Sequence, residues 1–372
     1  MRVLSLVSLI VSLFVSLSIH AQSFEQITDI RLHEQQASVR GAAMGGVSDG
    51  DPVLNPAAVG GVTRTFFSIS GVQLDRVDDR GLAHALAVMP AGDRLVVAAH
   101  YRGNPRVHGP ATVLLGNVPP GTLYIPRGDM YDRTDRRYGV SAAWTSGNVS
   151  VGAGAELHEL DERAAVGLTI LVDGMHGDLV VARLTGRELV PNAGIRWRVT
   201  PRVALAAAYN GGGEFARVID ACRLVGDQPI RCSAEHARLF ATKQPTPSAM
   251  RASITISPLE NLTVTGEAVR RNYAAPAEAR PFLADPLRDV TELRAGAEYR
   301  IRAIALRAGW WTDPTRYTEP EYVRLFALGR RQNHVTFGAG VDVGRARLEF
   351  AVDDAEAPAL RRAVAGVTFG MR

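Results

Sequence analysis

The sequence predicts an all-β fold, a transmembrane antiparallel β-barrel, and three observations lead to this prediction. The chain is rich in turn-forming residues, with 36 glycines and 20 prolines among 372 residues. Apolar and polar residues alternate with a period of two, in runs of about ten residues. Short turns alternate with long connections along the chain. Short turns on one rim and long loops on the other are typical of outer-membrane barrels.

The composition argues against several other classes of protein. The chain is 46% hydrophobic and 22% charged, with a net charge of +4, which is unlike a disordered chain. Past the first 20 residues no apolar run approaches the ~18 residues that a membrane-spanning helix requires. Basic residues are spread along the chain and nearly matched by acidic ones, so nucleic-acid binding is not expected.

The beginning of the chain has the pattern of a secretory signal. Arg2 supplies a short positive region, residues 3–19 are apolar and rich in serine, and Ala21 is a small residue at the cleavage position. We therefore expect residues 1–21 to be removed on export. A membrane anchor is the alternative, disfavoured because the stretch is short and no basic flank follows it.

The two cysteines fit an exported protein. Cys222 and Cys232 are ten residues apart, with Gly226 and Pro229 between them. Because exported proteins fold in an oxidising compartment, we expect these cysteines to form a loop-closing disulfide. No histidine or cysteine partners lie nearby at ligand spacing, so neither a metal site nor a cofactor is expected.

The alternating segments predict the strands. The clearest ones cover residues 94–102, 192–199, 250–257, 292–300, 335–343 and 345–353. Counting hairpins gives about 14 strands, an even number that places both ends of the barrel on the periplasmic side. Residues 160–188 are ambiguous: they form either an extracellular hairpin or two more strands, for a total of about 16.

Aromatic residues lie near both ends of the predicted strands. Trp144 and Trp197 lie beside short turns, and a second group lies near the long loops: Tyr101, Tyr209, Tyr273, Trp310 and Trp311. We expect two aromatic girdles at the membrane interfaces. Alternation alone also describes a soluble sandwich with one wet face, which is the alternative fold.

The polar faces of the predicted strands carry charges of both signs. An arginine facing lipid costs ~2–4 kcal/mol at mid-depth, so we expect these side chains to line the lumen. The candidates are Arg94, Arg196, Arg198, Arg251, Glu267, Arg294, Glu298, Arg307 and Arg347. Their expected role is cross-strand ion pairing; the alternative is that one or two arginines guide the carboxylate of a ligand.

The sequence carries no convincing catalytic pattern, and we do not expect an enzyme. Asp161 and Glu162 are adjacent, so in a strand they face opposite sides. The string Gly46-Val-Ser-Asp-Gly50 has the spacing of a nucleophile elbow, but neither the strand before it nor the helix after it is predicted.

Two segments before the first strand resemble a known family. Val39-Arg-Gly-Ala-Ala-Met-Gly-Gly-Val47 and Asp51-Pro-Val-Leu-Asn-Pro-Ala-Ala-Val59 are similar to a segment of FadL/TodX-type outer-membrane transporters and the related PorV-type barrels. The matching residues are Met44, Gly45, Gly46, Asn55, Pro56 and Ala57. The resemblance implies that residues 22–63 fold inside a barrel of residues 64–372 as a plug, which this motif positions.

The resemblance also implies a function. A FadL-like protein would be a channel in a Gram-negative-type outer membrane for passive uptake of hydrophobic or amphipathic, fatty-acid-like small molecules through a plugged polar lumen. Its partners would be outer-membrane lipid and the hydrophobic molecule. A PorV-like component of a protein secretion or assembly system, with protein partners, is one alternative. A soluble periplasmic β-sandwich binding protein is the other.

Overall fold

The computed structural model describes residues 38–48, 50–74, 80–103, 107–109, 131–168, 178–221, 223–225, 228–230, 243–273, 288–315, 331–356 and 361–370. The predicted signal and both cysteines of the predicted disulfide, Cys222 and Cys232, lie outside these residues. Within the described part of the chain, no helix is long and apolar enough to cross a membrane.

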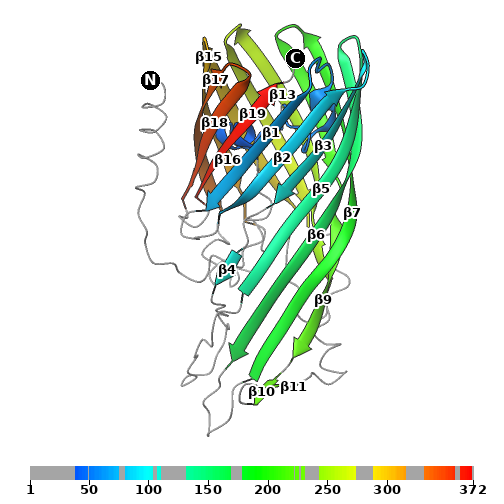
Figure 1. Ribbon diagram of the computed structural model, residues 1–372, viewed down its shortest axis with the longest axis vertical. Helices are drawn as coiled ribbons and strands as arrows, with labels where there is room; N and C mark the ends of the chain where they lie inside the picture. Colours follow the sequence, from blue (N-terminus) through cyan, green and yellow to red (C-terminus); the bar gives the residue numbers. More distant parts are fainter. Residues whose placement is uncertain are drawn as a thin grey trace.

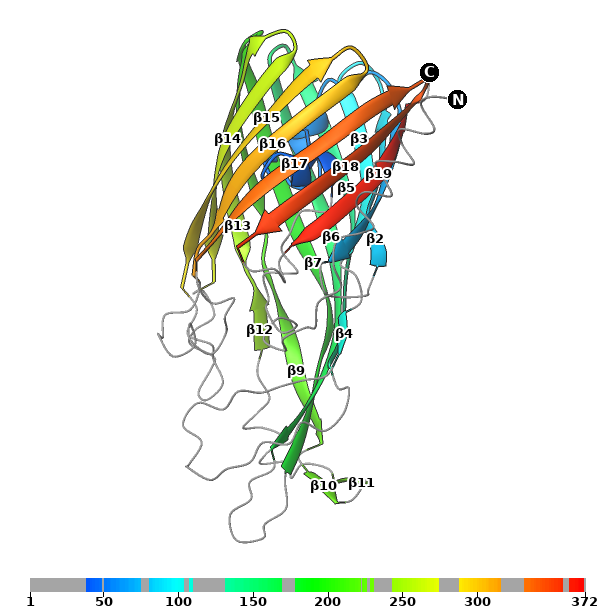
Figure 2. The same ribbon diagram turned by 90° about the vertical axis from the view of Figure 1, so that its left-hand side faces the viewer.

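The described strands form a closed antiparallel barrel (Figures 1 and 2). They are β1 (Phe66–Leu74), β2 (Arg80–Pro90), β3 (Leu95–Gly103), β4 (Val107–Gly109), β5 (Tyr131–Ser146), β6 (Val149–Leu168), β7 (Asp178–Thr200), β8 (Val203–Asn210), β9 (Gly213–Ala221), β12 (Lys243–Thr246), β13 (Ser248–Leu259), β14 (Leu262–Asn272), β15 (Val290–Ile301), β16 (Ile304–Asp313), β17 (Gln332–Val343), β18 (Ala346–Ala355) and β19 (Arg362–Gly370). Strand β1 pairs with both β2 and β19, which closes the sheet. The segments β10 (Arg223–Val225) and β11 (Gln228–Ile230) form a separate small hairpin.

The barrel has 14 strands, as the hairpin count predicts. β3 continues into β4, β8 into β9, and β12 into β13, because each pair of segments runs along the same neighbouring strands. The alternative of two extra strands in residues 160–188 is wrong. The described residues among them, 160–168 and 178–188, lengthen β6 and β7 to 20 and 23 residues, about twice the ~9–11 needed to cross a membrane. The excess projects beyond the barrel as a long hairpin (Figure 1).

The two rims of the barrel differ as predicted. The tight turns lie at the upper rim in Figure 1, where β1 begins and β19 ends. Gly92, Gly147 and Gly344 occupy three of these turns with positive φ, which glycine adopts without strain. The long connections follow the opposite ends of the strands. Since short turns of such barrels are periplasmic, the upper rim is the periplasmic one.

Side chains of the barrel alternate between an apolar outer face and a polar inner face. On the outer face Leu189 is 73% exposed and Phe337 is 56% exposed, whereas the inward Thr336 is fully buried. Buried carboxylates, guanidinium groups and imidazoles line the interior. An apolar outer surface around a polar interior suits a barrel surrounded by lipid. The alternative fold, a sandwich of two packed sheets, is wrong, because the strands form one closed barrel.

The aromatic girdles are only partly as predicted. Trp144, Trp197, Tyr209 and Trp310 are exposed on the outer face. Trp311, however, is buried and faces inward, where its ring stacks on His334 with 3.7 Å between ring centroids. Tyr273 is also buried. Neighbours in a strand point to opposite faces, so Trp310 and Trp311 cannot both face lipid.

The outer face gives a depth-dependent prediction. Phe337 lies midway along β17, and Val343, on the same face, ends that strand at the periplasmic rim. We expect Phe337→Arg to destabilise the folded barrel by ~2–4 kcal/mol, and Val343→Arg by about 0–1 kcal/mol, because the cost of a charge in lipid peaks at the midplane. Urea unfolding in lipid vesicles measures both. Equal losses for the two variants would mean that β17 does not cross the bilayer.

Candidate functional site: the occupied lumen

Residues 38–48 and 50–63, which we call the inner segment, lie inside the barrel in its periplasmic half (Figures 1 and 2). The segment contains two short helices, α2 (Val39–Ala43) and η3 (Pro56–Val59). Ser38 caps α2, since its Oγ accepts from the N–H of Gly41 at 3.2 Å. Asn55 caps η3 by accepting from the N–H of Ala57 at 3.0 Å. Asn-Pro-Ala is therefore a capped turn, as its chemistry suggests.

The Met44-Gly45-Gly46 part of the motif lies directly on the barrel wall. Gly45 and Gly46 have φ values of 67° and 77°. The N–H of Gly45 donates to Thr336 Oγ1 at 2.9 Å, and the Thr336 hydroxyl donates to the carbonyl of Ala43 at 3.0 Å. A Cβ on Gly45 would lie 2.6 Å from the carbonyl oxygens of Ala295 and Trp310. Only glycine fits this contact.

The wall is itself built of glycine where the motif contacts it. Gly296 and Gly309 are opposite each other on β15 and β16, and a Cβ on Gly309 would overlap with the N atom of Gly45. Gly152 and Gly194 form a similar pair on β6 and β7, where the contacts are Pro56, Ala57 and Asn55. Each half of the motif therefore has its own pair of wall glycines. In the sequence, such a contact position can be recognised as a glycine that falls on the polar face of a predicted strand.

Buried ion pairs anchor the inner segment on the β13–β15 side. Glu267 accepts from the N–H of Ser48 at 2.8 Å and from Arg251 Nη1 at 2.9 Å, and the Ser48 hydroxyl also bonds to it. Arg294 donates to the carbonyl of Gly46 and to Glu292, both at 2.5 Å. Carboxylate and guanidinium groups thus compensate each other's burial while they hold the segment.

A second group of ion pairs centres on Glu298. Its carboxylate accepts from Arg307 at 2.6 Å, from Arg300 at 2.8 Å and from Arg40 of the inner segment at 3.4 Å. Arg307 also lies 2.8 Å from Glu349. This group links β15, β16 and β18 to the inner segment.

The structure distributes the predicted lumen residues unevenly. The buried ones are Arg251, Glu267, Arg294, Glu298 and Arg307. Arg196 is half-buried on β7. Arg347 is half-buried near the periplasmic rim, where it donates to Asp342 at 2.5 and 2.8 Å. Arg94 and Arg198 differ from the prediction, because they are exposed at that rim. The alternation that places side chains inside ends where a strand meets its turn.

Sequence reasoning missed the buried histidines of the lumen. His100 lies 2.9 Å from Glu156, His158 lies 2.9 Å from Asp135, and His334 lies 2.8 Å from Asp353, all three pairs being buried. A search for the spacing of metal ligands or catalytic bases does not find these histidines. They can be found in the same way as the arginines, as titratable residues at inward positions of a strand. No group of residues suited to holding a metal ion occurs in the described part of the chain.

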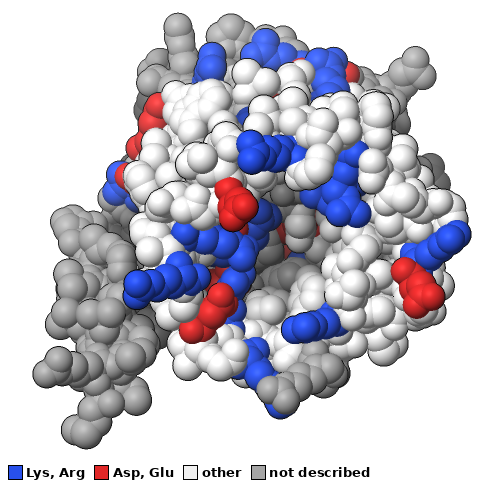
Figure 3. All heavy atoms as spheres, turned by 90° about the horizontal axis from the view of Figure 1, so that it is seen from above, with Lys and Arg blue, Asp and Glu red and all other residues white. Residues whose placement is uncertain are grey.

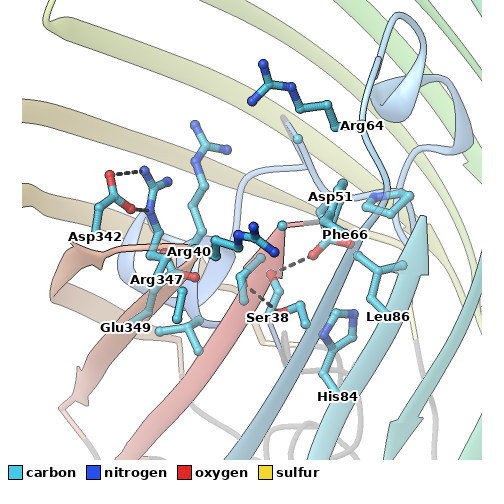
Figure 4. A pocket seen from close by; sticks show the side chains of 18 of the residues that line it. Ser38, Arg40, Asp51, Arg64, Phe66, His84, Leu86, Asp342, Arg347 and Glu349 are labelled. Atoms are coloured by element: carbon cyan, nitrogen blue, oxygen red, sulfur yellow. Dashed lines mark hydrogen bonds and ion pairs between the residues drawn. The ribbon is translucent and has the colours of Figure 1, made fainter. Parts of the chain in front are cut away.

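A cavity of about 780 Å³ lies beside the inner segment (Figure 4). We call it the rim cavity, because turn residues Gly344 and Arg345 and the strand end Gly370 line it. It lies between the inner segment and strands β1, β2, β18 and β19. Its walls include Phe66 and Leu86, and its basic residues are Arg40, Arg64, Arg345 and Arg347. Figure 3 shows basic side chains gathered around a hollow at this rim.

Comparison with solved structures identifies the fold. The toluene transporter TbuX of Ralstonia pickettii matches with a TM-score of 0.61 and 17% identity, over 90% of this chain and 98% of that one. A Pseudomonas aeruginosa FadL homologue matches with a TM-score of 0.60 and 13% identity, over 90% and 96%. The Pseudomonas putida toluene transporter TodX gives 0.58 and 14%, over 90% and 97%.

Comparisons at the level of sequence give no match. No model of a protein family matches the chain, and neither does any curated protein sequence. The similarity therefore lies in the path of the backbone, which the three solved structures share over nine-tenths of the chain. This chain has the fold of the FadL/TodX-type outer-membrane transporters, as the segments around Met44 and Asn55 indicate.

Proposed function

We propose that this protein is an outer-membrane channel for passive uptake of hydrophobic or amphipathic small molecules. The observation that best supports the proposal is the rim cavity, an open space beside the inner segment in the periplasmic half of the lumen. A molecule entering from the long-loop side would travel down the lumen and leave through this cavity. The inner segment acts as a plug that denies free passage to ions and water.

The size and lining of the rim cavity support this route. Binding sites for small organic molecules typically measure ~300–1,000 Å³, and the cavity has about 780 Å³. Phe66, Leu86 and Val39 provide apolar contacts, while Arg40 and Arg347 lie within reach of a polar end group. This mixture suits a molecule with an apolar body and one polar end, of which a fatty acid is an example.

The anchoring of the inner segment supports its role as a plug. Hydrogen bonds and ion pairs join it to β14, β15 and β17, on one side of the barrel, and wall glycines on β6 and β7 receive η3 on another. The rim cavity lies where β1, β2, β18 and β19 face the segment. Deeper in the barrel, Val39 and Ala43 of α2 pack against Ala351 and Val364. Passage beside the segment therefore requires a shift of α2 but not removal of the whole segment.

The uptake channel is favoured over the secretion component by the structures compared. Two of them are described as toluene transporters, and the third as a FadL homologue. The closed barrel with an apolar outer face also removes the soluble sandwich from consideration.

Filling the rim cavity tests the proposal. Ser68 and Thr368 are register partners on β1 and β19, and both line the cavity. We expect Ser68→Trp with Thr368→Trp to lower the initial rate of uptake of labelled toluene at least about fivefold, since the added rings narrow the route. The assay uses intact cells that lack general porins, because their lipopolysaccharide leaflet resists apolar solutes.

The matched control is the neighbouring pair on the outer face. Ile69 and Val367 are also register partners on β1 and β19, one residue away from the first pair, and Ile69 faces outward. Ile69→Trp with Val367→Trp adds the same rings to the lipid side and should leave uptake unchanged. Equal rates in both double variants and the parent would contradict the proposed route.

A further inference from the structure

One histidine in the lumen has no partner in the part of the chain that the structure describes. His84 is 3% exposed, and both of its ring nitrogens lack a hydrogen-bond partner there. The other buried histidines, His100, His158 and His334, each contact a carboxylate. A buried polar group without a partner is unfavourable, and native structures contain few of them. An unpaired imidazole at such a position therefore calls for a partner beyond the described residues, which a bound molecule can provide.

The missing partner can approach His84 from the rim cavity once the covered ring nitrogens turn toward it. His84 is one of the residues that line this cavity, and Figure 4 places it below Leu86 and away from Arg64. Along β2, Leu86 and His84 lie four and six residues before Pro90, where the strand ends at the periplasmic rim. His84 is thus about 20 Å along the strand from that rim, at the inner part of the cavity.

The register of β1 and β2 places apolar surface beside the imidazole. Phe66 is opposite Val88, Ser68 is opposite Leu86, and Ser70 is opposite His84. Residues two apart share a face and are separated by about 7 Å along a strand, which is about the length of a one-ring molecule with a polar substituent. A ligand whose ring contacts Leu86 would therefore bring its polar end to His84.

We propose that His84 is the specificity-determining contact of the rim cavity: its imidazole hydrogen-bonds to the hydroxyl or carboxyl group of an amphipathic ligand. The channel then favours such a molecule over a hydrocarbon of the same size. Neutral imidazole offers one donor and one acceptor, so it pairs with a hydroxyl group in either direction and accepts from a carboxylic acid. This inference rests on the proposed uptake function and names the ligand chemistry that the cavity selects.

The test compares two solutes that differ by one hydroxyl group, toluene and benzyl alcohol. Uptake of each is measured in porin-deficient cells producing the full chain or one of two variants. His84→Phe keeps a ring of similar size without hydrogen-bonding groups, and His84→Gln keeps a donor and an acceptor. We expect His84→Phe to lower the ratio of the benzyl alcohol rate to the toluene rate about tenfold, as loss of one hydrogen bond to the hydroxyl group would. His84→Gln should retain most of the rate for benzyl alcohol.

The possible outcomes separate this inference from the proposed function. If the parent chain takes up toluene but both solutes slow equally in His84→Phe, His84 only maintains the shape of the lumen and the inference fails. It also fails if benzyl alcohol uptake is the same in all three proteins. If the parent chain takes up neither solute, the uptake function itself is wrong, and the inference falls with it. The mobility of unboiled samples on a gel shows that each variant is folded.

Discussion

Replacing Gly309 with alanine will convert the protein into a leaky pore. A Cβ at this position would overlap with the N atom of Gly45 and the carbonyl carbon of Met44. Both are backbone atoms, so no side-chain rotation relieves the contact. Overpacking a well-packed contact typically costs ~1–3 kcal/mol, and we expect the seated state of the inner segment to be destabilised by an amount near the upper end of this range. About 3 kcal/mol changes the ratio of seated to released inner segment by roughly 100-fold.

The readout for this variant is ion conductance across a planar lipid bilayer. The parent protein should conduct little, because the inner segment occupies the lumen, whereas Gly309→Ala should open frequently to a pore of porin size. Gly340→Ala is the matched control. Gly340 also faces the lumen, on the neighbouring strand β17, but its nearest contacts are Arg307 and Glu349 side-chain atoms at 3.5 Å. If the two variants conduct alike, close contact between Gly309 and the motif does not keep the inner segment in place.

Replacing Glu267 with glutamine will cause the largest loss of stability that we expect from one isosteric change. The Glu267 carboxylate neutralises Arg251 at 2.9 Å and accepts from the backbone of Ser48 at 2.8 Å, and both side chains of the ion pair are buried. Removing one partner of a buried ion pair typically costs ~3–5 kcal/mol, because the other charge remains buried without compensation. We therefore expect the unfolding midpoint in urea to fall strongly, and the inner segment to become susceptible to protease.

Asp342→Asn is the matched control for this loss. Asp342 also pairs with an arginine, Arg347 at 2.5 Å, but the pair lies at the periplasmic rim, where the Asp342 side chain is 44% exposed. Exposed ion pairs contribute about 0–1 kcal/mol. The same urea titration therefore should show a small shift for Asp342→Asn. Shifts of similar size in both variants would mean that water reaches the Glu267–Arg251 pair and screens it.

The fold was predictable from the sequence because a membrane barrel obeys one local rule throughout. Each strand alternates between lipid and lumen, so the inward position of Thr265 or the outward position of Phe337 follows from counting by two. The rule stops where a strand ends. Arg94 and Arg198 continue the alternation in the sequence but are exposed at the rim. Equally, nothing local distinguishes a membrane-crossing strand from the extension of β6 and β7, which left the strand count open.

The candidate site was predictable only where it depends on local chemistry. Asn55 and Pro56 indicate a capped turn, and Gly45 and Gly46 indicate positive φ, whatever surrounds them. The wall glycines, the carboxylate that bonds to Ser48 and the rim cavity all depend on which strands face the inner segment. That information is long-range: Ser48 and Glu267 are 219 residues apart in the chain. No periodicity in the sequence reports such a pairing.

Photolabelling with an apolar aryl diazirine tests the central claim most directly, because it records where a hydrophobic molecule resides in the folded protein. We predict that mass spectrometry of the labelled barrel, in its membrane, finds adducts on Phe66 and Leu86 of the rim cavity as well as on outward residues such as Phe67. An excess of unlabelled toluene should suppress the adducts on Phe66 and Leu86 and leave those on Phe67. Adducts on outward residues alone would contradict a route for hydrophobic molecules through the lumen.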